Sequence, residues 1–402
     1  MEIHLEGAVM VRSPLYLKIK RGEVFIWRCL LDEGSVFRVD EVGVPVLVES
    51  KNGADIELSA GEIRRTSIPE EWSYLVEEGV EEKTLVLGET DVGKSSLIVY
   101  TMNTIVSREG GEVSLLDSDI GQKDLGPVGT ISLASFREGP ILPWLKTPEI
   151  SYFVGDKTPR GNFTLMLAGV SLLERNARAP TFINTTGYLR DMAAMELKLR
   201  KIELLEPQLI VGIESGSGAV SRLLNKVPPY YRRIVLRCPP QVGQKSRDLR
   251  ASLRKANISK YLRGASELDL CVEEIFIQGL ELEKDEVLSK CLGVEVYRSE
   301  ERKNIIKIIS SERPAEERIL FLEEMTGKRV EVWDLTFYRN LYTGLLNERG
   351  LCMGVGLIKD LSIKEGKISV LTTVSHKPKG LRLGKLRFSE DGEEIVPSKH
   401  KE

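Results

Sequence analysis

The chain has 402 residues, too many for one typical domain, so we expect two or three domains. Its 42% hydrophobic and 29% charged residues are typical of a folded, soluble protein, and the net charge of −3 neither indicates nor excludes a nucleic-acid partner. The sequence lacks an apolar run long enough to span a bilayer and a secretory signal, so we expect an intracellular, cytoplasmic protein with no membrane partner.

The first 80 residues have the pattern of a small β domain. Short apolar segments alternate with turn signals such as Arg21-Gly22 and Asn52-Gly53. Strands are predicted at 8–11, 15–19, 23–30, 35–39 and 44–49. Closely spaced short strands are typical of a sandwich or barrel, so we expect an N-terminal β-rich domain over residues 1–80.

Residues 81–265 change to an alternation of strands and helices. Strands of the fully buried type are predicted at 84–87, 113–117, 151–154, 181–184, 209–213 and 234–237, and helices at 94–107, 162–176, 189–205 and 246–262. This alternation predicts an α/β domain with a parallel sheet. From residue 266 the β pattern returns, with one predicted helix at 315–324, so we expect a C-terminal β-rich domain over 266–402.

The strongest signal is a G-x-x-x-x-G-K-S sequence between the first predicted strand and helix of the α/β domain. It consists of Gly88, Glu89, Thr90, Asp91, Val92, Gly93, Lys94 and Ser95, and Ser96 follows it. In such a P-loop, backbone N–H groups surround the nucleotide phosphates, the lysine reaches the β- and γ-phosphates, and the serine ligates Mg²⁺. A chance glycine-rich turn is the alternative, and the flanking strand and helix count against it.

These observations predict a fold and a pair of cofactors. The fold class is α/β, with a P-loop NTPase-type parallel sheet core flanked by N-terminal and C-terminal β-rich domains. The N-K-x-D signature of guanine-nucleotide binders does not follow the loop, which favours ATP, with Mg²⁺, as the cofactor. We therefore predict that residues 88–96 bind ATP.

Asp117 ends the next predicted strand, and Asp119 lies two residues beyond it. Two acids separated by one residue point to the same side of an extended strand, at the edge of the sheet where P-loop proteins bind ligands. One acid can hold magnesium while the other accepts a proton. An acidic turn at a strand end is the alternative reading.

Further along the chain, residues 232–263 contain ten lysines and arginines against one acid. This local positive charge is compatible with binding of an anionic polymer, and equally with an ordinary solvated surface.

Together the motifs resemble the polynucleotide 5′-hydroxyl kinases. That family includes the kinase component of mRNA 3′-end formation and tRNA splicing and the kinase of pre-rRNA processing. The resemblance covers the whole central domain in the correct order. It consists of the P-loop, a D-x-D-x-G-Q segment that ends at Gln122, a "clasp" and an R-x-x-x-R "lid". The clasp residues are Thr185, Thr186, Gly187 and Tyr188, and the lid residues are Arg250 and Arg254. The family has tryptophan where this chain has Tyr188, so an aromatic face is kept.

The resemblance implies roles for these residues. The implied catalytic residues are Lys94, Asp117, Arg250 and Arg254, with Asp117 as the base. The implied metal ligands are Ser95 and Asp119, and the implied substrate-binding residues are Gln122 and the four clasp residues. For Gln122, the bound nucleotide is the alternative contact. Considered alone, the two arginines fit an ordinary surface stripe, and Tyr188 fits a core aromatic.

The implied activity is transfer of the γ-phosphate of ATP to the 5′-hydroxyl end of RNA. DNA is the alternative acceptor, because no residue pattern identifies a reader of the 2′-hydroxyl. Two other functions stay open: a catalytically silent ATP-binding scaffold of an RNA-processing complex, and a P-loop kinase of a small metabolite. Intact motifs count against the scaffold, and the basic lid region counts against the metabolite. RNA is the expected partner, alongside RNA-processing proteins.

Overall fold

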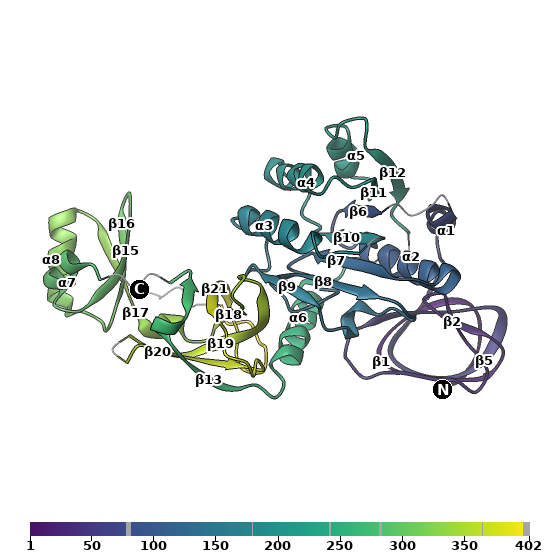
Figure 1. Ribbon diagram of the computed structural model, residues 1–402, viewed down its shortest axis with the longest axis horizontal. Helices are drawn as coiled ribbons and strands as arrows, with labels where there is room; N and C mark the ends of the chain where they lie inside the picture. Colours follow the sequence, from purple (N-terminus) through teal and green to yellow (C-terminus); the bar gives the residue numbers. More distant parts are fainter. Residues whose placement is uncertain (78–81, 179, 241–242, 281–283, 364, 397–402) are drawn as a thin grey trace. The chain divides into compact units, whose positions relative to one another are not determined.

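The computed structural model describes residues 1–77, 82–178, 180–240, 243–280, 284–363 and 365–396 (Figure 1). The chain forms two compact units, Met1–Asn257 and Ile258–Glu402. The boundary predicted between residues 80 and 81 lies outside the described residues, and the division into three domains stays a prediction. None of the helices within the described ranges is long and apolar enough to cross a membrane.

The N-terminal part of the first unit is a five-stranded antiparallel sheet that curls on itself (Figure 1). Its strand order is β3 (Cys29–Leu31), β2 (Val24–Ile26), β5 (Pro45–Thr66), β1 (Glu2–Arg21) and β4 (Val36–Val39). Val9 of β1 faces both Val48 and Arg65, so β5 pairs with both edges of β1 and leaves neither edge open there. The predicted β-rich character is confirmed. The predicted short strands at 8–11 and 15–19 are one strand, because the chain passes Ser13 and Pro14 as an irregularity without reversing.

Seven further strands of the first unit form the sheet that carries the candidate site. Their order is β12 (Arg232–Arg237), β11 (Leu209–Glu214), β6 (Lys83–Gly88), β10 (Thr181–Thr185), β7 (Val113–Ser118), β8 (Thr130–Phe136) and β9 (Ile150–Phe153). The five strands from β12 to β7 are parallel, which confirms the predicted P-loop type of sheet. The two outer pairings, β7 with β8 and β8 with β9, are antiparallel, and the sequence pattern did not predict β8. Because β10 lies between β6 and β7, the ends of these three strands are neighbours.

Helices cover this sheet. They are α2 (Lys94–Glu109), α3 (Phe163–Glu174), α4 (Met192–Leu205) and α5 (Ala219–Leu224). The unit also contains α1 (Glu70–Glu77), the short 3-10 turn η1 (Pro143–Leu145) and the first part of α6 (Arg247–Leu262). The four predicted helices are confirmed with small changes at their ends, whereas α1 and α5 were not predicted. One apolar core is shared by the curled sheet and the α/β sheet, and it includes Trp27, Leu97 and Val86. The curled sheet is therefore packed against the domain that carries the P-loop.

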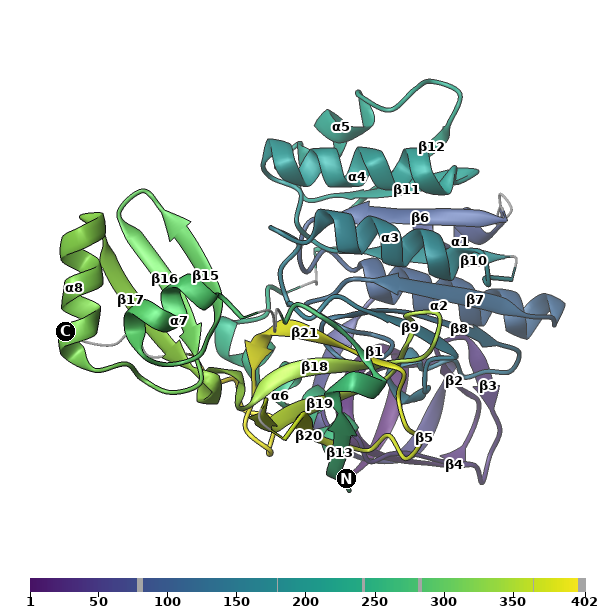
Figure 2. The same cartoon turned by 60° about the vertical axis from the view of Figure 1, so that its left-hand side comes forward.

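The second unit contains two small sheets (Figure 2). The larger has the order β13 (Ser266–Cys271), β20 (Lys367–Thr372), β19 (Cys352–Ser362), β18 (Leu341–Leu346), β21 (Gly380–Arg387) and β14 (Phe276–Gln278). The smaller, β15 (Val296–Arg302), β16 (Ile305–Ser310) and β17 (Arg329–Asp334), packs with α7 (Glu286–Leu292) and α8 (Glu316–Thr326). The 3-10 turns are η2 (Val272–Glu274) and η3 (Leu335–Tyr338). Each sheet has its own apolar core.

Candidate active site

The P-loop connects the end of β6 to the start of α2. Gly93 precedes the helix with φ 95°, a left-handed conformation that favours glycine. At Gly88 a Cβ atom would lie 2.7 Å from Cγ2 of Val92 and 3.1 Å from the Ile213 carbonyl oxygen, so a side chain has no room there. The glycines therefore let the backbone close around a small volume. Bare N–H groups at the start of a helix are well suited to bind phosphates.

Lys94 folds back over the loop that carries it. Its side chain is 7% exposed. Its Nζ donates to the main-chain oxygens of Gly88 at 3.1 Å and Glu89 at 2.7 Å. Burial lowers the pKa of Lys94, and the nearby charge of Asp119 opposes that effect. The lysine thus lies over the loop, and its hydrogen bonds to described residues all go to neutral main-chain oxygens, so phosphate oxygens would offer it stronger acceptors.

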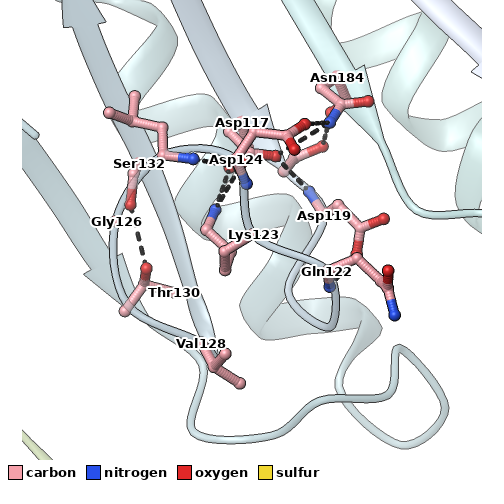
Figure 3. Close-up of polar contacts among 12 residues, drawn as sticks. Asp117, Asp119, Gln122, Lys123, Asp124, Gly126, Val128, Thr130, Ser132 and Asn184 are labelled. Atoms are coloured by element: carbon pink, nitrogen blue, oxygen red, sulfur yellow. Dashed lines mark hydrogen bonds and ion pairs between the residues drawn. The ribbon is translucent and has the colours of Figure 1, made fainter. Parts of the chain in front are cut away.

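Asp117, at the end of β7, is buried and fully hydrogen-bonded (Figure 3). Its Oδ1 accepts from the backbone N–H of Asp119 at 3.1 Å and from Nδ2 of Asn184 at 3.3 Å. Its Oδ2 accepts from the N–H groups of Asp124 and Leu125, both at 3.0 Å. The same oxygen pairs with Nζ of Lys123 at 2.9 Å, and both side chains of this pair are 0% exposed. Asp117 therefore holds the turn of residues 119–125 onto the end of β7.

Two further acids, Asp119 and Asp124, belong to this turn (Figure 3). Oδ1 of Asp119 accepts from the N–H groups of Gly121 and Gln122, at 3.0 and 3.1 Å. Burial and the charge of Asp117 raise the pKa of Asp119, whereas Lys94 acts to lower it. Burial, together with the charge of Asp117, raises the pKa of Asp124 to about 7, although hydrogen bonding to Ser95 opposes the rise. Asp119 thus lies within electrostatic reach of Lys94, and Asp124 lies beside Ser95.

The clasp begins at Thr185, the last residue of β10, and lies between the P-loop and the acidic turn. Oγ1 of Thr185 donates to the Val86 carbonyl at 2.8 Å and so joins β10 to β6. Gly187 lies so close to the P-loop that a Cβ atom there would be 2.3 Å from Oγ1 of Thr90 and 2.5 Å from its Cα. Tyr188 is half-buried, and its Oη donates to Asp191, which caps the start of α4 through the Ala194 N–H. The partial exposure of Tyr188 counts against the core interpretation.

The lid residues lie on α6, and one of them contacts the P-loop. Arg250 forms an ion pair with Asp91 through Nη2 and Oδ2. The same Oδ2 accepts from the backbone N–H of Lys245 at 3.0 Å, and Nζ of Lys245 lies 3.3 Å from Oε1 of Gln122. Arg254 is half-buried one turn further along α6. The structure thus brings together the P-loop, the start of the lid helix and Gln122.

Several site residues were missed by the sequence analysis. Asp124 and Lys123 are part of the acidic turn, and their only sequence signal is a charged pair shortly after Asp119. Glu89 accepts from Ser215 and Arg190, two segments distant in sequence. Burial acts to raise the pKa of Glu89, but these hydrogen bonds outweigh it and lower the pKa to about 2. Such partners become visible only once the fold brings them together.

The oxygen ligands at the site fit a magnesium ion that also binds phosphates. The described ranges contain no cluster of three or more His, Cys, Asp or Glu side chains that could hold a metal ion without other ligands. Mg²⁺ in nucleotide sites instead takes one or two protein oxygens and completes its shell with phosphates and water. Ser95 of the P-loop and Asp124 lie near each other and offer such oxygens.

Comparisons with known proteins agree with this arrangement. Residues 88–264 match the family model described as mRNA cleavage and polyadenylation factor CLP1 P-loop. A polyribonucleotide 5′-hydroxyl-kinase of Pyrococcus furiosus is 33% identical over 332 residues, which cover 78% of this chain and 89% of that protein. The protein of the same description from Pyrococcus horikoshii is 32% identical over 332 residues, 77% of this chain and 87% of that protein.

A solved structure shows a similar fold. It is the structure of wild-type Clp1p in complex with Pcf11p. Its superposition on this chain has a TM-score of 0.67 at 13% sequence identity and covers 96% of this chain and 97% of that chain. At this identity the likeness concerns the fold alone. The residues that match the family model, 88–264, include both the clasp and the lid segments. The chain therefore belongs to the family of polyribonucleotide 5′-hydroxyl-kinases related to CLP1.

Proposed function

We propose that this chain is an ATP-dependent kinase that transfers the γ-phosphate to the 5′-hydroxyl end of RNA. The observation that carries the proposal is the meeting of three motifs at neighbouring strand ends: the P-loop after β6, the clasp after β10 and the acidic turn after β7. Phosphoryl transfer requires a nucleotide and an acceptor to be held side by side, with charge stabilisation between them. The family relationship supplies the chemical class of the acceptor.

The nucleotide proposed for the P-loop is ATP with Mg²⁺. Its phosphates would be bound by the loop N–H groups and by Lys94, whose present acceptors are two neutral carbonyl oxygens. Ser95 and Asp124 would hold the magnesium ion, which supplies charge neutralisation on the phosphates when bound. Asp124 takes the place of Asp119 in this proposal, because Asp124 lies beside Ser95, whereas Oδ1 of Asp119 already accepts from two N–H groups of its own turn.

The base that takes the proton of the acceptor hydroxyl is proposed to be Asp119. The sequence analysis gave this role to Asp117, and the surroundings of Asp117 argue against it. Both oxygens of Asp117 are occupied by donors, one of them a buried ammonium, so neither oxygen is open to accept the proton of a hydroxyl. Asp119 uses one oxygen to hold its own turn and lies within electrostatic reach of Lys94, where the γ-phosphate is expected.

The acceptor is proposed to bind at the clasp. Tyr188 would stack on the terminal base, and the ring of Phe163, whose centroid lies 6.4 Å away, extends the aromatic surface. Arg250 and Arg254 would stabilise the charge of the transferring phosphoryl group, since charge-assisted bonds to phosphate are among the strongest available. Stacking is tolerant of base identity, so the site suits RNA ends of any sequence.

The test of this proposal is transfer of label from γ-labelled ATP to three acceptors: RNA with a 5′-hydroxyl, DNA with a 5′-hydroxyl, and mononucleosides. We expect transfer to RNA by the wild-type protein and none by Lys94→Ala. Nucleotide binding without transfer to any acceptor would support the ATP-binding scaffold instead. Transfer to mononucleosides or other small molecules, without preference for the oligonucleotide, would support a metabolite kinase. Equal transfer to DNA would broaden the acceptor class.

The choice between the two candidate bases has its own test. Asp119→Asn should lose most of kcat and keep its melting temperature, because one oxygen still accepts from the turn. Asp117→Asn should lower the melting temperature, because the buried Lys123 ammonium loses its only carboxylate partner in the described part of the chain. If Asp117→Asn were fully stable yet inactive, while Asp119→Asn retained kcat, Asp117 would be the base after all.

A further inference from the structure

Two lysines on one face of α4 are completely buried. Lys198 and Lys201 are each 0% exposed, whereas lysine is rarely buried unless it is paired with a carboxylate. Within the described part of the chain neither forms an ion pair. Each instead donates to neutral oxygens: Lys198 to Thr186, and Lys201 to Oγ of Ser118 at 2.8 Å. The first of these contacts involves the clasp.

Lys198 binds both polar atoms of one clasp residue. Its Nζ donates to the carbonyl oxygen of Thr186 at 2.6 Å and to Oγ1 of the same residue at 3.0 Å. The next residue, Gly187, is in close contact with Thr90 of the P-loop. Lys198 therefore supports the clasp from the side of α4, at the point where the clasp meets the nucleotide loop.

The stability of the fold does not account for a lysine at this position. A methionine has a similar length, would fill the same space, and would avoid the cost of removing an ammonium from water. A buried amine is favoured only where its hydrogen bonds or its charge are needed. Within the described residues, the two hydrogen bonds to Thr186 are the only ones that the Lys198 side chain forms.

We propose that Lys198 is a positioning residue of the kinase site, which orients the Thr186 hydroxyl and fixes the clasp for binding of the RNA end. This inference rests on the proposed function. A protonated lysine can only donate, so Oγ1 of Thr186 must accept from it and the hydroxyl proton of Thr186 is left for the substrate. A neutral amine can accept that proton instead, and the hydroxyl then turns away from the substrate.

The protonation state of Lys198 therefore controls the clasp. Burial lowers the pKa of Lys198 well below its ordinary value. The charges of Lys201 on α4 and Lys94 on α2 lower it further, and that of Asp119 after β7 opposes them. Because a lowered pKa means that the proton is lost at a lower pH, affinity for RNA should fall on the alkaline side at a pH where an ordinary lysine is still charged.

The first experiment compares Lys198→Met with Lys201→Met in transfer to an oligoadenylate that has a 5′-hydroxyl. The two changes remove equally buried amines, one from the clasp and one from Ser118. Lys198→Met should raise the KM for the oligonucleotide on the order of tenfold, the effect of losing hydrogen bonds from a charged group, with the KM for ATP unchanged. Lys201→Met should leave the KM for the oligonucleotide close to the wild-type value. Equal effects of the two changes, or none in Lys198→Met, would overturn the inference.

The second experiment measures the KM for the oligonucleotide as a function of pH. In the wild type and in Lys201→Met it should rise on the alkaline side. In Thr186→Val, which keeps the side-chain shape and lacks the hydroxyl, the KM should be raised at every pH and the alkaline rise should disappear. An alkaline rise in Thr186→Val equal to that of the wild type would assign the titration to another group. A wild-type protein without transfer to RNA would contradict the proposed function itself, so the two failures are distinguishable.

Discussion

Arg250 of the lid helix and Asp91 of the P-loop form an ion pair in which the arginine Nη2 donates to the aspartate Oδ2. The Asp91 side chain is 6% exposed and that of Arg250 is 31% exposed, so the contact is largely shielded from water. Asp91 also accepts from the backbone N–H of Lys245, which joins the start of the lid helix to the loop. The lid arginine is thus already held beside the loop that is expected to carry the transferring phosphate.

From this contact we predict that Arg250→Ala and Arg254→Ala lower kcat much more than they raise the KM for ATP. An arginine that stabilises charge in a phosphoryl transition state can contribute on the order of 10³-fold to kcat. Arg247→Ala is the matched control, since Arg247 is exposed on the same helix and should tolerate the change. Steady-state kinetics with saturating RNA provide the measurement. Near-normal kcat in both lid variants would mean that these arginines are only surface charge.

Much of the site was predictable because its parts are contiguous in sequence. A P-loop is recognised from eight successive residues, and a buried parallel strand from its apolar run. The environment of Asp124 was not predictable, because an acid in a turn is ordinarily solvated. Only the fold buries it beside Asp117 and Ser95. The same holds for Lys198, whose position on α4 is compatible with a surface lysine until Thr186 is placed against it.

The raised pKa of Asp124 predicts a specific pH dependence of stability. Its pKa in the folded protein is about 7 against an ordinary value of 3.8, so between these values the folded state holds a proton that the unfolded state has lost. The free energy of unfolding contributed by this group therefore falls as pH rises through that window, by on the order of 2–4 kcal/mol. Asp124→Asn should flatten this dependence in urea unfolding experiments without nucleotide or magnesium.

The control for this experiment is Asp248→Asn, which changes an exposed acid on α6 and should leave the dependence as in the wild type. Addition of Mg²⁺ with ATP should stabilise the wild type most at neutral pH, because a cation favours the charged form of Asp124. A wild-type curve with the same slope as that of Asp124→Asn would show that Asp124 is ionised in the folded protein throughout, and would contradict the assignment.

The close contact between Gly187 and Thr90 predicts that Gly187→Ala impairs transfer. The new Cβ would lie 2.5 Å from both Cα and the backbone nitrogen of Thr90, so either the clasp or the P-loop must move. A displacement of about 1 Å in a catalytic site can lower the rate on the order of 10²-fold. Trimming the Thr90 side chain should not restore activity, because the clash involves the backbone. Recovery in the Gly187→Ala, Thr90→Ala double variant would limit the contact to the hydroxyl.

Tyr188 combines a ring proposed to stack on RNA with a hydroxyl that donates to Asp191 at 2.8 and 2.7 Å. Tyr188→Ala should weaken oligonucleotide binding by about 1–3 kcal/mol, the usual contribution of one stacked base, with little change in ATP affinity. Tyr188→Trp should preserve or tighten oligonucleotide binding. Tyr188→Phe separates the two parts of the side chain. It should bind the oligonucleotide normally, and its stability should fall by about 0.5–1.5 kcal/mol through the lost hydrogen bond.

Melting curves and oligonucleotide titrations on the same Tyr188 variants decide between stacking and a core role. Truncation of a fully buried aromatic typically costs about 3–5 kcal/mol, whereas the ring of Tyr188 is half-buried and should cost less. A large fall in the melting temperature of Tyr188→Ala with unchanged oligonucleotide affinity would mean that the ring is a structural core residue and does not stack on RNA. Weakened affinity with a modest fall in melting temperature, together with normal binding by Tyr188→Phe, would instead place the terminal base on the aromatic face, because only the ring and not the hydroxyl is then required.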